Sequence, residues 1–276
     1  MFESPSLAQW MVHTPHPFLI RFGENFGIRY YGLAYLLGFL GAAWLLRRYH
    51  RAGRSPLDGN GIADLMFALV LGVFVGGRVG YFVLYQPATL LRDPLALVRV
   101  WEGGMASHGG FLGVTVALAW FARSRGPSLR QLGDLIVTTA PLGLLLGRLA
   151  NFLNGELWGR ISDVPWAMVF SATGGGPHPR HPSQLYEAAL EGALLLTYVQ
   201  WRFWRTDVAI RQPGRLTGEF LIAYALVRAL GELFREPDAA LILGLSRGTF
   251  YSIFLVGAGA WLILRRPRPA ASERKA

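Results

Sequence analysis

Residues 147–159 read GRLANFLNGELWG and follow directly on an apolar segment that begins near Leu132. A charged side chain at the centre of a bilayer costs about 2.5–3.5 kcal/mol on insertion scales, so its presence there is by default a sign of function. The stretch brings one guanidinium, two amides and one carboxylate into such a segment. The sequence therefore predicts a polar site inside a membrane protein, formed by Arg148, Asn151, Asn154 and Glu156.

The composition supports an all-α polytopic membrane protein. Of the 276 residues, 52% are hydrophobic and 13% are aromatic. Several apolar runs approach roughly 20 residues, which is the length a helix needs to cross a bilayer. We therefore predict one integral-membrane domain, residues 1–276, with about seven transmembrane helices at residues 30–46, 62–85, 105–121, 132–154, 184–204, 216–234 and 248–264.

The net charge of +10 reflects membrane topology rather than a nucleic-acid partner. Sixteen of the 27 Lys and Arg residues fall on one side of the predicted spans, at residues 47–54, 123–130, 202–215 and 265–276. Cytoplasmic segments carry the excess of positive charge. We therefore expect the N-terminus outside and the C-terminus, with its basic tail of residues 265–276, in the cytoplasm.

The N-terminal segment lacks the pattern of a signal peptide, and the lack of cysteine excludes thiol chemistry. Residues 1–20 have no basic start followed by an apolar run, so we expect no cleavable signal peptide. We place residues 1–29 along the outer surface. Because the chain has no cysteine, it has no thiolate nucleophile, disulfide or Cys-based metal site. We expect no metal and no other cofactor.

Four polar residues are predicted to share one depth. With a rise of 1.5 Å per residue, Arg78 and Arg148 lie roughly 24 Å above the inner starts of their helices, and Arg228 roughly 18 Å. His108 lies near the outer start of a short descending span. All four therefore fall in the outer half of the membrane, where they can face one cavity.

The sixth predicted span carries a row of polar residues. Tyr224, Arg228, Glu232 and Arg235 are spaced by four, four and three positions, which places them on one helical face. Arg228 and Glu232 could simply compensate each other as an i, i+4 ion pair. An anionic ligand would instead use both Arg228 and Arg148. Guanidinium groups suit bidentate phosphate recognition, so two arginines at one depth favour a phospholipid headgroup or a phosphate leaving group.

His108 lies within the glycine-rich run GGMASHGG of residues 103–110. It is either a hydrogen-bonded residue of a packing loop or a general base, since histidine titrates near neutral pH. Asn151 and Asn154 are likewise open to two interpretations. They either hold helices together by hydrogen bonds or orient a substrate ester or headgroup.

The run HPSQLYE of residues 181–187 opens the fifth predicted span. Ser183 is expected to cap this helix, and Glu187 to interact favourably with the helix dipole in the first turn. A role in the site is the alternative for this run.

Residues 147–159 match the pattern Gly-Arg-x-(Gly/Ala)-Asn-Phe-x-Asn-x-Glu-x-x-Gly at every fixed position. The pattern is diagnostic of the prolipoprotein diacylglyceryl transferases, and the chain resembles this family. The resemblance continues in order through five further blocks and covers essentially the whole chain, at residues 30–32, 77–81, 103–110, 181–187 and 234–238.

The resemblance implies a seven-span enzyme of the bacterial inner membrane. It would transfer the diacylglyceryl group of phosphatidylglycerol to the lipobox cysteine thiol of a prelipoprotein, forming a thioether and releasing glycerol phosphate. The catalytic roles of the family fall on Tyr31, His108, Arg148 and Arg228. Phosphatidylglycerol-binding roles fall on Arg148, Asn151, Glu156, Gly159, Tyr224, Glu232 and Arg235.

Two other function classes remain as alternatives. An anion or lipid transporter could use the same arginines, but it predicts an inverted repeat and a site reachable from both faces. The candidate polar groups here all fall in the outer half. An intramembrane protease would need a nucleophile motif, and the sequence contains no plausible one.

Overall fold

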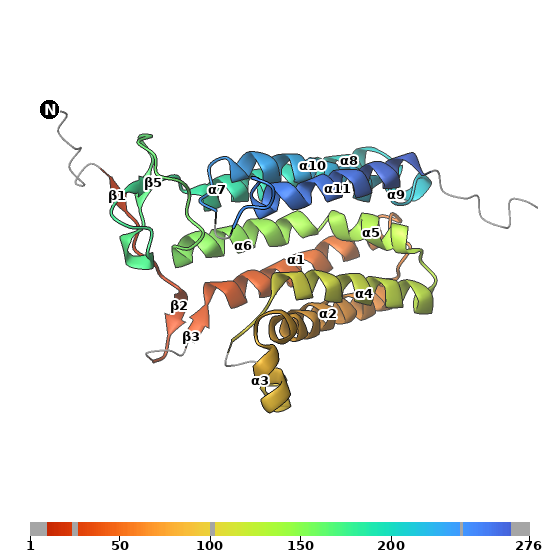
Figure 1. The fold of residues 1–276 in the computed structure, drawn as a ribbon. Coiled ribbons are helices and arrows are strands. Elements are labelled where there is room, and N and C mark those ends of the chain that lie inside the picture. Colours follow the sequence, from red (N-terminus) through yellow and green to blue (C-terminus); the bar gives the residue numbers. More distant parts are fainter. Residues whose placement is uncertain (1–9, 24–26, 100–102, 238–239, 266–276) are drawn as a thin grey trace, which may run out of the picture. The chain divides into compact units, whose positions relative to one another are not determined.

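The computed structural model describes residues 10–23, 27–99, 103–237 and 240–265 of a mostly helical chain (Figure 1). The chain forms two compact units, of which the first comprises residues 1–42 and 136–276 and the second residues 43–135. Helix α1 (Tyr30–Arg51) begins in the first unit and ends in the second. Of the predicted basic tail, residues 266–276 lie outside the described residues.

The first unit is built mainly from helices in its C-terminal half. Helices α10 and α11 lie side by side (Figure 1), and they cross closely at Gly218 and Gly259. A Cβ atom on either glycine would approach the other's carbonyl oxygen to within 2.7 Å. The elements are α6 (Ala140–Asn154), α7 (Ser183–Glu187), the π-helical segment η5 (Ala188–Leu194), α8 (Leu195–Arg205), α9 (Val208–Arg211), α10 (Arg215–Glu232) and α11 (Arg247–Leu264).

Short strands complete the first unit and fix its N-terminal segment. β1 (Met11–Val12) pairs in parallel with β4 (Met168–Val169), which pairs antiparallel with β5 (Pro179–Arg180). β2 (Phe18–Arg21) and β3 (Gly27–Arg29) form a separate antiparallel pair. The segment predicted for the outer surface, residues 1–29, is therefore partly β-structured, and its residues 1–9 and 24–26 lie outside the described residues.

The second unit is a helical hairpin with short connecting helices. Asp58 caps α2 (Gly59–Tyr85) by accepting a hydrogen bond from the backbone N–H of Gly61 at 2.7 Å. The remaining elements are α3 (Pro87–Arg92), the 3₁₀ helix η2 (Pro94–Leu97), α4 (Ser107–Arg125) and α5 (Leu129–Val137), whose last two residues belong to the first unit.

Glycines bring α2 and α4 into backbone contact. A Cβ atom on Gly113 would lie 1.9 Å from the carbonyl oxygen of Gly72, and one on Gly109 would lie 2.2 Å from that of Gly76. No other residue type could occupy these positions without moving the helices apart. The spacing of four residues on both helices is the small-residue pattern of closely packed membrane helices.

The structure contains helices that are long and apolar enough to cross a membrane. Among the described residues α2 and α11 each qualify, and the bent pair α5 and α6 together would form a third. Other predicted spans are helical but more polar or interrupted. α10 carries Arg215, Glu219, Arg228 and Glu232, and the predicted span at residues 184–204 is divided by the π-helical segment η5. The membrane character is thus supported, and the count of seven spans stays a prediction.

Candidate active site

The end of α6 positions the polar residues of the opening sequence motif. Gly155 ends the helix in the left-handed conformation, with φ of 71°, as glycine does at many helix C-termini. The chain then turns back, so that the backbone N–H of Glu156 donates to the carbonyl oxygen of Asn151 at 3.1 Å. This turn carries the Glu156 carboxylate to the side chains of the last helical turn.

Four side chains meet at this turn, since Asn154 Nδ2 also donates to Glu156 Oε1, at 3.3 Å. We call Tyr31, Asn151 and Glu156 the Glu156 cluster. The Tyr31 hydroxyl donates to Glu156 Oε1, and Asn151 Nδ2 donates to the Tyr31 hydroxyl. Asn151 Nδ2 also lies 3.1 Å from Glu156 Oε1. The cluster therefore joins α1 to the end of α6. It unites three of the residues that the sequence assigned to the site, and Asn151 hydrogen-bonds across helices, as one of its two interpretations required.

The buried amide of Gln184 and the buried hydroxyl of Ser183 hydrogen-bond the backbone of the same turn. Gln184, fully buried, donates from Nε2 to the carbonyl oxygen of Glu156 at 2.7 Å. The Ser183 hydroxyl donates to the carbonyl oxygen of Leu157 at 3.1 Å. The expectation that Ser183 caps its helix was wrong, because Pro182 holds the capping position and no side chain caps the helix there.

Gly159 lies where three segments meet. Its backbone N–H donates to the carbonyl oxygen of His181 at 2.9 Å, and it forms an isolated β-bridge with Arg235. A Cβ atom here would lie 2.5 Å from the carbonyl oxygen of His181 and 2.6 Å from that of Phe234. Close backbone packing thus accounts for the glycine, and its predicted role in lipid binding stays a prediction.

Six side chains form a second, larger group next to the Glu156 cluster along α6. We call Arg148, Glu187, Glu191, Arg228, Glu232 and Arg235 the arginine–glutamate cluster. Arg148 reaches Glu191 through Nη2 at 2.9 Å and Glu187 through Nη1 at 3.0 Å. Arg228 reaches Glu187 at 2.6 Å and Glu191 at 2.9 Å, both through Nη1. The two arginines predicted to act together therefore do converge, from α6 and α10.

The remaining members extend the cluster towards the loop after α10. Arg228 Nη2 also pairs with Glu232, four residues on, as the compensating-pair interpretation required. Arg235 Nη1 lies 3.2 Å from Glu187 Oε1. The prediction that Arg235 continues the helical face of Tyr224 was wrong, because α10 ends at Glu232. Arg235 reaches the cluster from beyond the helix end instead.

Of the two carboxylates at the centre of the cluster, Glu191 is the one that the sequence analysis missed. Glu187 and Glu191 are both fully buried. Glu187 was expected to interact with the helix dipole, with a role in the site as the alternative, and it contacts three arginines. Glu191 was not considered at all. A signal was available, because two carboxylates four residues apart in a predicted span share one helical face and need partners there.

Tyr224 lies one turn before Arg228 on α10 and stacks on Phe220, with ring centroids 6.0 Å apart.

His181 lies outside the predicted spans, edge-on to the rings of Tyr186 and Phe234. Burial lowers the pKa of His181 below its usual value, which favours the neutral imidazole. In the described part of the chain, no cluster of three or more His, Asp or Glu side chains could hold a metal ion.

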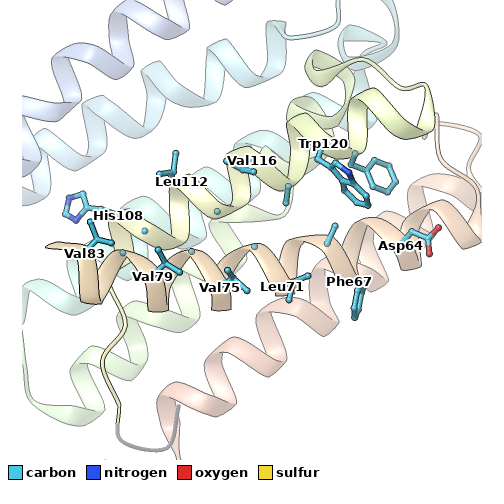
Figure 2. A pocket seen from close by; sticks show the side chains of 18 of the residues that line it. Asp64, Phe67, Leu71, Val75, Val79, Val83, His108, Leu112, Val116 and Trp120 are labelled. Carbon is cyan, nitrogen blue, oxygen red and sulfur yellow. The ribbon is translucent and has the colours of Figure 1, made fainter. Parts of the chain in front are cut away.

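The second unit carries the other predicted site residue, His108. It lies in the first turn of α4 and is exposed. It borders one end of an apolar groove of about 870 Å³ between α2 and α4, and the ion pair of Asp64 and Arg125 borders the other end. Figure 2 shows the aliphatic and aromatic side chains that lie along this groove, among them Val75, Val79, Leu112, Val116 and Trp120.

Arg78, in the same unit, differs from Arg148 and Arg228 because its guanidinium donates to backbone carbonyls. Its guanidinium donates to Ala96 at 2.6 Å, to Arg99 at 2.7 Å and to Leu97 at 3.0 Å. It also donates to Gly103 and Gly104. Arg78 therefore holds the loop between η2 and α4, which is a structural role for a buried arginine.

Comparison with known sequences places the chain in a family. A family profile described as prolipoprotein diacylglyceryl transferase matches residues 17–265. The chain belongs to the prolipoprotein diacylglyceryl transferase family. The match includes the Glu156 cluster, the arginine–glutamate cluster and His108.

Relatives of this family are similar over most of their length. A phosphatidylglycerol–prolipoprotein diacylglyceryl transferase of Rhodospirillum rubrum is 47% identical over 262 residues, which cover 92% of this chain and 94% of the relative. The enzyme of the same name from Photobacterium profundum is 46% identical over 257 residues, covering 91% and 93%. The enzyme from Vibrio vulnificus is 49% identical over 217 residues, covering 78% and 77%.

Proposed function

We propose that this chain transfers the diacylglyceryl group of phosphatidylglycerol to the lipobox cysteine thiol of prelipoproteins. The reaction forms a thioether and releases glycerol phosphate. The family membership supports the reaction, since relatives that are 46–49% identical carry its name. The observation that carries the site assignment is the convergence of Arg148 and Arg228, from two helices, on the same pair of buried carboxylates.

The arginines fit the part of the reaction that develops charge. A carbon–oxygen bond of the lipid breaks, and its electron pair stays on the phosphate oxygen as glycerol phosphate leaves. Guanidinium groups stabilise such charge best where water is excluded. The side chains of Arg148 and Arg228 are only 15% and 13% exposed. We therefore assign both to the lipid phosphate in the ground state and in the transition state.

The attacking sulfur belongs to the second substrate, because this chain has no cysteine. The thiolate is the reactive form, and a free thiol has a pKa of about 8.5, so a base must accept its proton. We assign this role to His108, with orientation of the headgroup as the alternative role. The apolar groove that begins at His108 supports a substrate with long hydrocarbon chains.

The Glu156 cluster supports recognition of the headgroup. Its carboxylate, amide and phenol groups offer donors and acceptors of the kind that a glycerol headgroup requires. We assign Asn151, Glu156, Gly159, Tyr224, Glu232 and Arg235 to binding of phosphatidylglycerol, and Tyr31 to catalysis beside them. We also propose seven spans in the bacterial inner membrane, an outer N-terminus, and a single domain whose site opens to the outer half.

Replacement of either arginine tests the assignment. Arg148→Ala and Arg228→Ala are each expected to lower transfer by about 100-fold or more, the usual loss for a donor that stabilises an oxyanion. The assay follows the conversion of a lipobox peptide to a heavier, more apolar product by detergent-solubilised protein with phosphatidylglycerol. Arg215→Ala is the matched control, since it changes an arginine of α10 that pairs with Glu219 instead. Retained transfer in both site variants would refute the assignment.

His108→Gln separates the two roles of His108 in the same assay. Loss of a base lowers kcat, whereas loss of a group that orients the lipid raises KM for phosphatidylglycerol. Unchanged kcat and KM would remove His108 from the site altogether.

A further inference from the structure

Glu191 joins the two arginines of the site in the way a bound oxyanion would. Its Oε2 lies 2.9 Å from Arg148 Nη2, and its Oε1 lies 2.9 Å from Arg228 Nη1. Each oxygen of the carboxylate thus contacts one of the two guanidinium groups. The Nε of Arg148 also donates to Oε2, at 3.2 Å. A phosphate that contacted both arginines would use these same donors.

The arginine–glutamate cluster has no excess positive charge with which to neutralise a ligand. Three arginines are matched by three glutamates in the arginine–glutamate cluster. The phosphodiester of a phospholipid brings one further negative charge. An anion that enters a neutral, largely buried cluster must compete for the guanidinium donors with the carboxylates already there, because a buried charge without such partners is costly.

Of the central carboxylates, Glu191 is the one held by fewer arginines. Glu187 contacts Arg148 and Arg228 and, in addition, Arg235, whose side chain is only 6% exposed. Each additional ion pair raises the cost of moving Glu187. Among the described residues, Glu191 makes its ion pairs with the two arginines of the site alone.

The backbone around Glu191 is also unusual. Glu191 lies within η5, a π-helical segment of the kind found at functional sites. The neighbouring Gly192 lets α6 approach closely, since a Cβ atom there would lie 2.7 Å from the Cα of Leu145. Arg148 follows Leu145 by three residues on the same helix. The close approach therefore sets the distance between Arg148 and Glu191.

We propose that Glu191 is a built-in anion that occupies the arginine pair in the empty site, and that the phosphate of the lipid substrate replaces it. The inference rests on the proposed function for the identity of the ligand. Glu187 remains as the fixed counter-ion, while Glu191 holds the two guanidinium groups at the spacing that a phosphate needs. Glu191 is thus a positioning residue that sets the affinity of the site for phosphate.

This exchange has a measurable consequence for affinity. The apparent dissociation constant equals the intrinsic constant divided by the fraction of molecules whose binding site is available. Glu191 lowers that fraction by holding both arginines. Neutralising it therefore tightens binding of phosphate esters, which is the opposite of what loss of an ordinary structural residue does.

The experiment uses the full-length protein in detergent with glycerol 1-phosphate as the probe and glycerol as its uncharged counterpart. Binding is followed by calorimetry and by the rise in melting temperature. Glu191→Gln is expected to bind glycerol 1-phosphate at least about fivefold more tightly than the unaltered protein, at the low end of typical couplings between linked sites. Its melting temperature without the probe is expected to fall, and glycerol should have no effect.

Two matched variants separate the exchange from a general change of charge. Glu232→Gln removes the same charge from the same cluster, but Glu232 pairs with Arg228 alone of the two site arginines. Its effect should be smaller than that of Glu191→Gln. Glu219→Gln changes a carboxylate held by Arg202 and Arg215 elsewhere on α10 and should leave affinity unchanged. Glu191→Asp keeps the charge but shortens the side chain by one methylene group, so its carboxylate contacts the arginines less well. This variant should also bind glycerol 1-phosphate more tightly, even if the Gln variant does not fold.

The outcomes distinguish this inference from the proposed function. Equal or weaker probe binding in Glu191→Gln and Glu191→Asp would overturn the exchange, as would an equal gain in Glu232→Gln. A fall in KM for phosphatidylglycerol in the Glu191 variants would support both. Tighter probe binding in a protein that transfers nothing from phosphatidylglycerol would support the exchange while refuting the function.

Discussion

His13 shows how one residue of the N-terminal segment holds the end of the helix that carries the site. Its ring lies 4.9 Å from that of Phe152 and 5.0 Å from that of Phe170, measured between centroids. The backbone N–H of His16 donates to the carbonyl oxygen of Leu153 at 2.9 Å. The last turn of α6 thus has partners from residues far earlier in the chain.

The burial of His13 predicts acid sensitivity. Burial lowers the pKa of His13 below its usual value near 6.5, so the folded protein binds the proton less readily than the unfolded chain. The stabilisation is complete above the usual pKa and is lost as the pH falls through it towards the lower folded value. The melting temperature should therefore fall between pH 7 and pH 5, and fall less in His13→Gln. His16→Gln changes an exposed histidine of the same segment and should keep most of the acid sensitivity, because burial lowers the pKa of His13 more than repulsion from His16 does.

Single residues of the site were predictable because polar groups are rare in apolar segments. Arg148, Asn151 and Arg228 stand out by that criterion alone, and they do lie in the clusters. Their partners were not predictable in the same way. Whether Arg228 pairs with Glu232, with Glu187 or with both depends on how α7 and α10 pack, and sequence spacing reports only neighbours on one helix.

At the scale of elements, the crossing of α2 and α4 is set by glycine. The two helices touch through backbone atoms at Gly72, Gly76, Gly109 and Gly113. Without a strong hydrophobic driving force between helices in lipid, such close van der Waals packing is a main source of stability. The groove that ends at His108 runs beside this crossing.

Adding one methyl group tests the crossing. Gly113→Ala would place a Cβ atom 1.9 Å from the carbonyl oxygen of Gly72, so the helices must separate. We expect a loss of about 1–3 kcal/mol in unfolding free energy, the usual cost of overpacking. Gly110→Ala on the same helix is the control, because its nearest neighbour would be 3.9 Å away. Equal stability of the two variants, measured by thermal unfolding in detergent, would contradict this account.

The elements of the chain were only partly predictable. Apolar stretches gave the approximate positions of α2, α6 and α11, because hydropathy alone identifies such segments. The π-helical segment η5 was not predicted, since its extra residue per turn depends on the packing of Gly192 against α6 rather than on local preference. The end of α10 was also misplaced, because residues 159–160 bond to the chain at residues 234–235 there.

At the scale of the whole molecule, the distribution of arginines predicts how the chain lies in the membrane. The loops at residues 47–54, 123–130 and 202–215, together with the tail at residues 265–276, carry 16 of the 27 Lys and Arg residues. Among the described residues, α2 and α11 are long and apolar enough to cross a membrane, and the orientation of the helices remains a prediction. The two compact units divide the predicted site residues between them, with His108 in the second and the remaining ones in the first.

The orientation can be measured directly because the chain lacks cysteine. Single replacements such as Ser55→Cys and Ser162→Cys then provide the only thiol in the protein. A membrane-impermeant maleimide added to intact cells should label position 162 and leave position 55 unlabelled until the membrane is broken. The reverse pattern would contradict the positive-inside assignment.

The paired arrangement of the arginine–glutamate cluster also bears on the electrical state of the cell. Moving one elementary charge through 100 mV changes its free energy by about 2.3 kcal/mol. The cluster holds as many carboxylates as guanidinium groups, so its net formal charge is zero. A displacement of the whole cluster across the membrane would therefore move no net charge, and the transmembrane voltage would do no net work on it.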